Sequence, residues 1–215
     1  MPRRVLDTPE EAAAAAADAL IAALKGKEKP TLALSGGHGG ELAAKALAAR
    51  ADALDWSRVD FFWADERRVP LDHPRSNYGL ARRLLLDPLR IQERRRHALI
   101  DPAKAEQDLL QLAPDGLTAV LLGLGEDGHT ASLFPGSPAV TSSSWVAEST
   151  SPAGEPRLTL TPAYLKRARF IAVLATGANK RPVVEKVSTD PSAELPIQTI
   201  GTMASWFLDE AAASN

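Results

Sequence analysis

The stretch LTAVLLGLGEDGHTASLFPG, residues 117–136, is the starting point for interpreting the whole chain. Its first six residues are mostly apolar and predict a buried strand. The loop that follows places Asp127 and His129 on either side of Gly128. Ligands bind beyond the carboxyl ends of strands in open α/β sheets, and histidine suits proton transfer near neutral pH. We therefore expect Asp127 and His129 to be catalytic; the alternative is a polar turn in which His129 only satisfies backbone groups.

Strand and helix patterns alternate on both sides of this stretch. We expect strands at residues 31–34, 59–63, 117–122, 145–148, 157–161 and 170–175, and helices at 9–25, 41–50, 78–86, 105–112, 179–188 and 202–213. Such alternation is typical of an α/β fold, with a mostly parallel twisted sheet and helices on both faces. We expect a single domain over residues 1–215, with a smaller strand-containing lobe beside the sheet.

The composition excludes several classes of function. The 215 residues are 45% hydrophobic and 24% charged, as in ordinary globular proteins, and the net charge of −2 favours neither nucleic acid nor an anionic membrane. The absence of cysteine removes thiolate catalysis, disulfides and cysteine-based zinc sites. Acidic residues interrupt the alanine-rich N-terminal segment, which therefore does not resemble an export signal. We expect a cytoplasmic protein without a membrane partner.

A glycine-rich loop, SGGHGG at residues 35–40, follows the strand expected at 31–34. Backbone N–H groups at such a loop, together with the dipole of the next helix, favour an anion such as a phosphate ester. We accordingly expect Gly36, Gly37, His38 and Gly39 to bind substrate. The spacing matches neither nucleotide-binding glycine pattern, and a plain flexible turn is the alternative.

Charged residues in three other segments are further candidates. The polar loop at 64–77 begins with Asp65, Glu66, Arg67 and Arg68, which form either a solvated surface turn or a site where arginine stabilises an oxyanion. Arg157 and Lys180 could close around a phosphate together with the glycine loop. We expect no metal, because the four histidines are dispersed; a mononuclear site of Asp127 and His129 is the open alternative.

Taken together, these segments resemble the 6-phosphogluconolactonase family, hydrolases of the oxidative pentose phosphate pathway. The resemblance runs in order along nearly the whole chain and is most specific in DGHTASLFPG; it comprises the glycine loop, ADERRVP with Ser76 and Asn77, GLGEDGHTASLFPG, EPRLTLT, TGANK and residues 195–211. It implies a Rossmann-like α/β fold, related to that of glucosamine-6-phosphate deaminase.

The resemblance also implies roles for the candidate residues. His129 is expected to be the general base that activates water, with Asp127 orienting it and Arg67 near the reacting end. Asp65 is expected among the substrate-binding residues, and the backbone of residues 36–39 is expected to hold the phosphate with Arg157 and Lys180. The implied substrate is a sugar phosphate lactone, with no metal or organic cofactor; the chain is expected to be a monomer or a weak homodimer.

The first loop differs from the family's pattern, and two other functions are alternatives. The family's first loop usually reads Ser-Gly-Gly-Ser-Thr-Pro, whereas here His38, Gly39 and Gly40 follow the two glycines, so we expect a looser loop with an additional N–H donor at Gly40. An amino-sugar phosphate deaminase or isomerase is the enzymatic rival, although Phe134 stands where the deaminase has a glutamate. A non-catalytic sugar-phosphate sensor is the other, although no segment here suits a DNA-binding module.

Overall fold

The computed structural model describes residues 2–213. The helices are α1 (Pro9–Leu24), α2 (Gly37–Ala48), α3 (Asn77–Ala81), α4 (Pro102–Leu112), α5 (Pro162–Leu165), α6 (Arg181–Thr189) and α7 (Gln198–Gly201). The strands are β1 (Arg3–Leu6), β2 (Thr31–Leu34), β3 (Asp60–Trp63), β4 (Asp65–Arg67), β5 (Ala119–Leu122), β6 (Val146–Thr150), β7 (Pro156–Leu160), β8 (Ile171–Ala175) and β9 (Ser205–Asp209).

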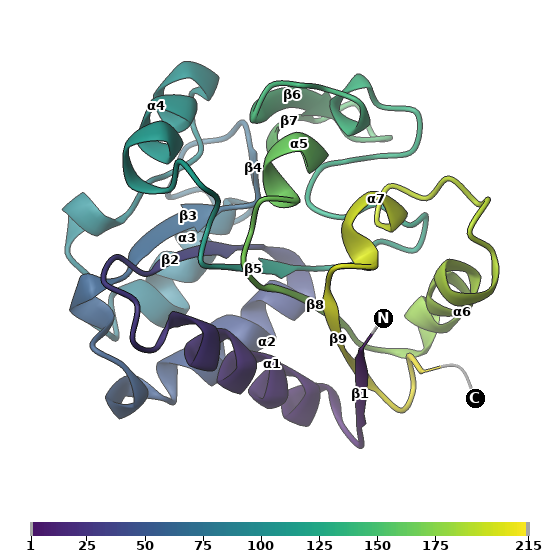
Figure 1. Cartoon of the computed structure of the whole chain (residues 1–215), viewed down its shortest axis with the longest axis horizontal. Helices are drawn as coiled ribbons and strands as arrows, with labels where there is room; N and C mark the ends of the chain where they lie inside the picture. The colour runs from purple at the N-terminus through teal and green to yellow at the C-terminus, as the bar shows by residue number, and fades with distance from the viewer. Residues whose placement is uncertain (1, 214–215) are drawn as a thin grey trace.

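Six strands form the large sheet, in the order β1-β9-β8-β5-β2-β3, and all its pairings are parallel. Its central strands are buried along their whole length, as in parallel sheets covered by helices on both faces. In Figure 1, α1 and α2 lie below this sheet while α5 and α7 lie above it. The predicted α/β fold with a mostly parallel sheet is therefore confirmed.

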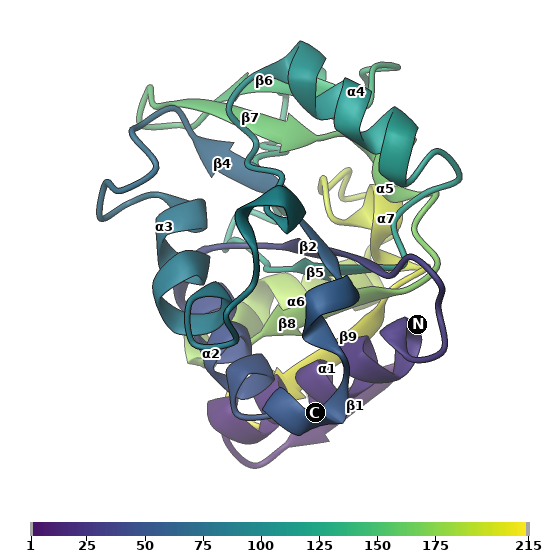
Figure 2. The same cartoon turned by 90° about the vertical axis from the view of Figure 1, so that its left-hand side faces the viewer.

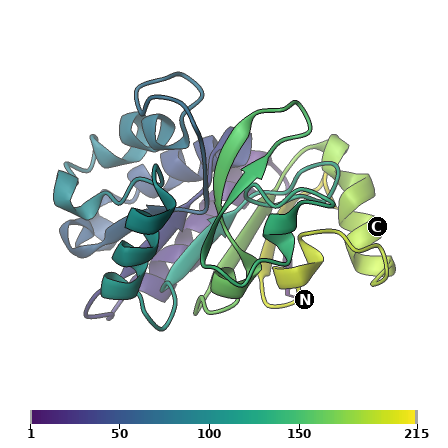
Figure 3. The same ribbon diagram turned by 90° about the horizontal axis from the view of Figure 1, so that it is seen from above.

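The predicted smaller lobe is an antiparallel sheet of three strands, in the order β4-β7-β6. Figures 1 and 2 show it stacked over the large sheet, and Figure 3 looks down on its β6–β7 hairpin. The chain passes from β3 to β4 through Ala64 alone, so the two sheets are joined within a few residues of the carboxyl end of β3.

Helix α1 shows how the local sequence sets an element. Thr8 caps it reciprocally with Glu11, and Pro9 occupies its first turn. Most of its alanines and both of its leucines are buried, whereas Ala22 is exposed. The helix predicted at 9–25 is confirmed to within one residue.

The helix predicted at residues 202–213 is wrong, because the chain forms β9 there. Trp206, Phe207 and Leu208 are consecutive and all buried, which a sheet covered on both faces accommodates. β9 pairs on one side with β8 and on the other with β1, an edge strand that the sequence analysis did not predict. Among residues 2–213, no helix is long and apolar enough to span a membrane.

Candidate active site

A pocket of about 410 Å³ opens beyond the carboxyl ends of β2, β5 and β8. β2 and β5 are neighbours, but the chain leaves β2 for β3 on one side and later enters β5 on the other. Strand order reverses at this point, which is where open α/β sheets bind ligands. Of the residues expected from sequence, the pocket is lined by Gly36, Gly37, His38, Gly39, Asp65, Arg67, His129, Arg157 and Lys180; Asp127 is in contact with His129.

One short loop builds the His129 side of the pocket. Nδ1 of His129 lies 2.5 Å from Oδ1 of Asp127, which also accepts the backbone N–H of His129 at 3.1 Å. A Cβ at Gly125 would lie 2.0 Å from His129 Nδ1, so only glycine permits the imidazole to pack here. The ring of Phe134 packs against the imidazole, with the centroids 4.8 Å apart.

The charge of Asp127 favours His129 as a general base. Partial burial raises the pKa of Asp127, but the hydrogen bonds that it accepts from His129 outweigh burial and leave that pKa below its ordinary value. An ionised carboxylate on Nδ1 keeps a proton on that nitrogen, which leaves Nε2 as the basic nitrogen of the ring. The Asp127–His129 pair can therefore accept a proton from a bound water.

The glycine-loop side of the pocket differs from the sequence expectation in two ways. Helix α2 begins at Gly37, so part of the predicted loop is the first helical turn, and the predicted start at residue 41 is wrong. The N–H of Gly40 donates to the carbonyl of Gly36 at 3.2 Å, so the expected additional donor is used inside the helix. The N–H groups of the first turn, from Gly37 to Gly39, have no acceptor inside the helix and can bind an anion.

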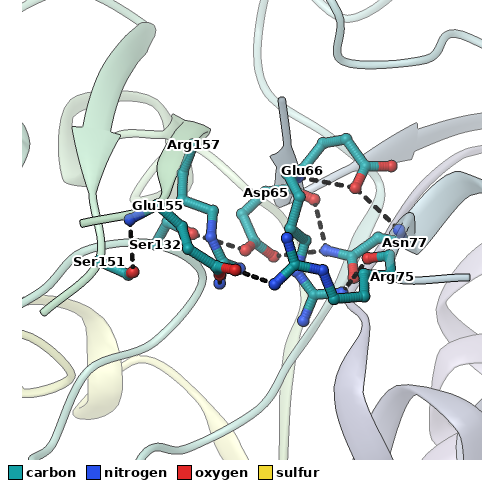
Figure 4. Close-up of polar contacts among 9 residues, drawn as sticks. Asp65, Glu66, Arg75, Asn77, Ser132, Ser151, Glu155 and Arg157 are labelled. Carbon is teal, nitrogen blue, oxygen red and sulfur yellow. Dashed lines mark hydrogen bonds and ion pairs between the residues drawn. The ribbon is translucent and has the colours of Figure 1, made fainter. Parts of the chain in front are cut away.

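Asn77 connects the glycine-loop side of the pocket to the small sheet. The sequence analysis did not single it out as a site residue. A Cβ at Gly36 would lie 1.7 Å from Oδ1 of Asn77, so the two residues are in close contact. Nδ2 of Asn77 donates to the carbonyl and to the carboxylate of Asp65, at 2.8 and 3.2 Å (Figure 4). Asp65 also accepts from Ser132 Oγ at 2.7 Å, which ties the His129 loop to the same network.

The surface-turn interpretation of residues 65–68 is wrong for Asp65 and Glu66, which are 6% and 2% exposed. Residues 65–67 form β4 and pair with β7, in place of the loop predicted there. The carboxylate of Glu66 accepts hydrogen bonds from the backbones of Arg67, Asn77 and Tyr78, at 2.7 to 2.8 Å, and from Ser76 Oγ. Burial raises the pKa of Glu66 while these bonds oppose the shift. Glu66 therefore holds the loop, and it does not line the pocket.

Two arginines form the cationic wall of the pocket. Arg67 and Arg157 are paired directly across β4 and β7, although the sequence analysis assigned them to different ends of the substrate. Burial lowers the pKa of Arg67, and the charge of Asp65 opposes that shift. Within residues 2–213, the buried Nε atoms of both arginines have no hydrogen-bond partner. Each guanidinium thus keeps one N–H that no group in residues 2–213 accepts.

Lys180 belongs to the wall formed after β8, in a short 3₁₀ turn (Ala178–Lys180). Its neighbour Asn179 donates from Nδ2 to Glu126 Oε1 at 2.7 Å. This bond connects the Lys180 turn with the His129 loop and was not expected from sequence. In the part of the chain that the structure describes, no group of three His, Asp or Glu side chains is arranged to hold a metal ion.

Comparison with known proteins agrees with this architecture. The chain is 38% identical to a 6-phosphogluconolactonase of Synechocystis over 205 residues, covering 86% of this chain and 84% of that protein. It is 32% identical to a 6-phosphogluconolactonase of Haemophilus influenzae, covering 84% and 85%. The structure of 6-phosphogluconolactonase from Trypanosoma brucei superimposes with a TM-score of 0.84 at 27% identity, covering 99% of this chain and 97% of that one.

A monomeric glucosamine-6-phosphate deaminase shares the fold, with a TM-score of 0.85 at 19% identity, over 99% of this chain and 98% of that one. Residues 7–207 match the family described as glucosamine-6-phosphate isomerases/6-phosphogluconolactonase. That match covers most of the sequence and includes every candidate site residue. The chain belongs to the glucosamine-6-phosphate isomerase/6-phosphogluconolactonase family.

Proposed function

We propose that this protein hydrolyses 6-phospho-D-glucono-1,5-lactone to 6-phosphogluconate. It is then a carboxylic ester hydrolase of the oxidative pentose phosphate pathway. The observation that carries the proposal is one pocket lined both by the imidazole of His129 and by the glycine turn, Arg157 and Lys180. Relatives at 38% and 32% identity bear the name 6-phosphogluconolactonase, which supports the same activity.

The chemistry requires a base near the lactone carbonyl. Nε2 of His129 takes a proton from water as the water oxygen attacks C1, and Asp127 stabilises the imidazolium that forms. The tetrahedral intermediate collapses with cleavage of the bond from C1 to the ring oxygen, which recovers the proton from the imidazolium. Because a lactone is an activated ester, a positioned base and oxyanion stabilisation, each worth ~10²-fold or more, suffice without a cofactor.

The opposite end of the substrate is held through its phosphate. The N–H groups of residues 37–39 at the start of α2, the fork of Arg157 and the ammonium of Lys180 supply donors and positive charge. Arg67 serves the lactone end in this proposal. Because Arg67 is paired with Arg157 across β4 and β7, one side of the pocket can contact both the lactone end and the phosphate end of the substrate.

Phe134 favours hydrolysis over the ring opening carried out by amino-sugar phosphate deaminases. Its ring packs against His129 and has no group that can transfer a proton. The test measures acid release from freshly prepared 6-phosphogluconolactone in a pH-stat, alongside ammonia release from glucosamine 6-phosphate. We expect accelerated acid release and no ammonia; ammonia with no acceleration of lactone hydrolysis would overturn the proposal.

We also propose a domain organisation, a location and an oligomeric state. Residues 1–215 form one domain, since Ala64 alone separates a strand of the large sheet from one of the small sheet. The protein acts in the cytoplasm as a monomer or weak homodimer, without a nucleic-acid or membrane partner. Size-exclusion chromatography with light scattering tests the oligomeric state.

A further inference from the structure

Glu155 lies between two arginines at the edge of the pocket. Its Oε2 accepts from Nη2 of Arg157 at 2.6 Å, and its Oε1 is paired with Nη1 of Arg75 (Figure 4). Arg75 belongs to the loop after β4, whereas Glu155 and Arg157 belong to the β6–β7 hairpin. We call these three side chains the arginine–glutamate clasp. A second hollow of about 300 Å³, which shares Gly37, Arg67 and Arg157 with the main pocket, is lined by all three of them.

The backbone holds Glu155 rigidly at this position. The N–H of Ser151 donates to the Glu155 carbonyl at 2.9 Å, and the N–H of Glu155 donates to Ser151 Oγ at 3.1 Å. Gly154, at φ +82°, closes the same turn by donating to the Ser151 carbonyl at 2.8 Å. A carboxylate on a rigid turn can orient a flexible guanidinium, because a functional side chain is only as well placed as its supports.

The two halves of the clasp differ in exposure. The side chains of Arg157 and Glu155 are 13% and 27% exposed, whereas that of Arg75 is 57% exposed. The inner pair is therefore shielded from water and its charge-assisted hydrogen bond is strong. The outer pair is well solvated, and such pairs contribute little.

We infer that Glu155 is a positioning residue, which aims the guanidinium of Arg157 at the anionic group of the substrate while Arg75 steadies the Glu155 carboxylate. This inference rests on the proposed function, because it assigns Arg157 to the substrate phosphate. With Nη2 held by Glu155, the remaining N–H groups of Arg157 have a defined direction. Less ordering entropy is then lost when the phosphate binds.

The charge of Glu155 and its positioning of Arg157 have opposite effects on phosphate binding. Glu155 places a negative charge beside an anion site, so Coulomb repulsion alone would weaken phosphate binding. If repulsion dominated, Glu155→Gln would bind phosphate more tightly than the unmodified protein. If positioning dominates, the same substitution weakens binding, because a neutral amide holds the guanidinium less firmly.

The experiment uses the full chain and two kinds of readout. The first is KM and kcat for 6-phosphogluconolactone, and the second is the calorimetric Kd for inorganic phosphate and for 6-phosphogluconate. For Glu155→Gln we expect KM and both Kd values to rise about tenfold with kcat nearly unchanged, the difference between a charged and a neutral hydrogen bond. Arg75→Gln should raise KM and both Kd values about twofold, whereas Arg75→Lys keeps the positive charge and should leave them at the values of the unmodified protein. The double variant Glu155→Gln/Arg75→Gln should give the same values as Glu155→Gln alone.

Arg68 and Glu148 provide the matched control. They form another ion pair between the stretch after β4 and the hairpin, but they border a neighbouring hollow and do not line the main pocket. Glu148→Gln should leave KM, kcat and both Kd values unchanged. Thermal melting of each variant identifies any loss of folding, and Glu155→Asp provides a second, less disruptive variant in that case.

Unchanged or tighter phosphate binding in folded Glu155→Gln would overturn the inference. An equal effect of Glu148→Gln would also overturn it, because a general change in charge would then explain the result. If the unmodified protein did not hydrolyse the lactone, yet Glu155→Gln bound phosphate tenfold more weakly, the proposed function would fail and the clasp would stand. If the unmodified protein hydrolysed the lactone normally, yet Glu155→Gln bound phosphate as tightly as the unmodified protein, the proposed function would stand and the inference about Glu155 would fail.

Discussion

The two ends of the pocket are built in different ways. The His129 end lies within one loop, where Gly125, Asp127 and His129 contact one another within five residues. The anion end combines the start of α2, the β6–β7 hairpin and the turn after β8, which are far apart in the sequence. The first arrangement is local and the second depends on the whole fold. We therefore expect substitutions at the first end to change kcat and those at the second to change KM or stability.

The largest effect should come from His129→Ala. Loss of the general base should lower kcat by about 10²- to 10⁴-fold, while 6-phosphogluconate binds with nearly the same Kd because the anion end is intact. Turnover in a pH-stat measures kcat, and calorimetry measures the Kd for 6-phosphogluconate. Near-normal turnover would refute the assignment of His129 as the base.

Gly125→Ala tests whether the local geometry of the imidazole matters. Its Cβ would lie 2.0 Å from His129 Nδ1 and would force the ring to move, so kcat should fall by about 10²-fold. Gly123 lies in the same loop and its Cβ would meet no protein atom within 4 Å, so Gly123→Ala leaves the imidazole in place and should change kcat by no more than about twofold. Because Gly123 lines the pocket, any effect of its added methyl group should fall on KM. Equal losses in the two variants would show that loop flexibility, and not ring position, is responsible.

Glu66→Gln should destabilise the wall that supports the anion end. The amide NH₂ cannot accept the hydrogen bonds of the backbone donors, and a buried unsatisfied donor costs about 2–3 kcal/mol in the free energy of unfolding. Urea denaturation measures the loss, with exposed Glu148→Gln as the control. An unaltered free energy of unfolding would mean that Glu66 does not hold this loop.

Lys180→Met should raise KM about tenfold with kcat little changed, because one charge-assisted contact to phosphate is lost. Arg181 is the matched control: its guanidinium donates to the carbonyls of Ala211 and Glu210, and it does not line the pocket. Arg181→Met should therefore leave KM unchanged. If both variants raised KM equally, net charge and not a specific contact would explain the effect.

The smallest effect concerns pH and Asp127. Because its pKa is lower in the folded protein, the ionised carboxylate stabilises the fold at any pH above its unfolded pKa. This stabilisation is lost as the pH falls through the folded pKa. The melting temperature of the unmodified protein should exceed that of Asp127→Asn at neutral pH, and the difference should vanish in acid. A difference that persisted in acid would assign it to the geometry of the loop.

Much of the fold was predictable because its signals are local. Apolar runs identified β2, β5 and β8, and the capping pattern of Thr8 with Pro9 identified α1. Strand β9 was not predicted, because a helix was expected at residues 202–213 and the burial of Trp206 depends on the flanking strands β1 and β8. Strand β4 was missed for the same reason, since charged residues indicate a strand only when a partner such as β7 covers them.

By itself, the sequence determined the alternation of strands and helices and the pairing of Asp127 with His129, because hydrogen bonds between neighbours in the chain need only a short turn. Tertiary structure alone decided that Glu66 holds the loop while Arg67 faces the pocket, and that Glu155 lies between Arg75 and Arg157. Those contacts join residues as many as 80 positions apart. Folding must bring such partners together before burial and charge can act between them.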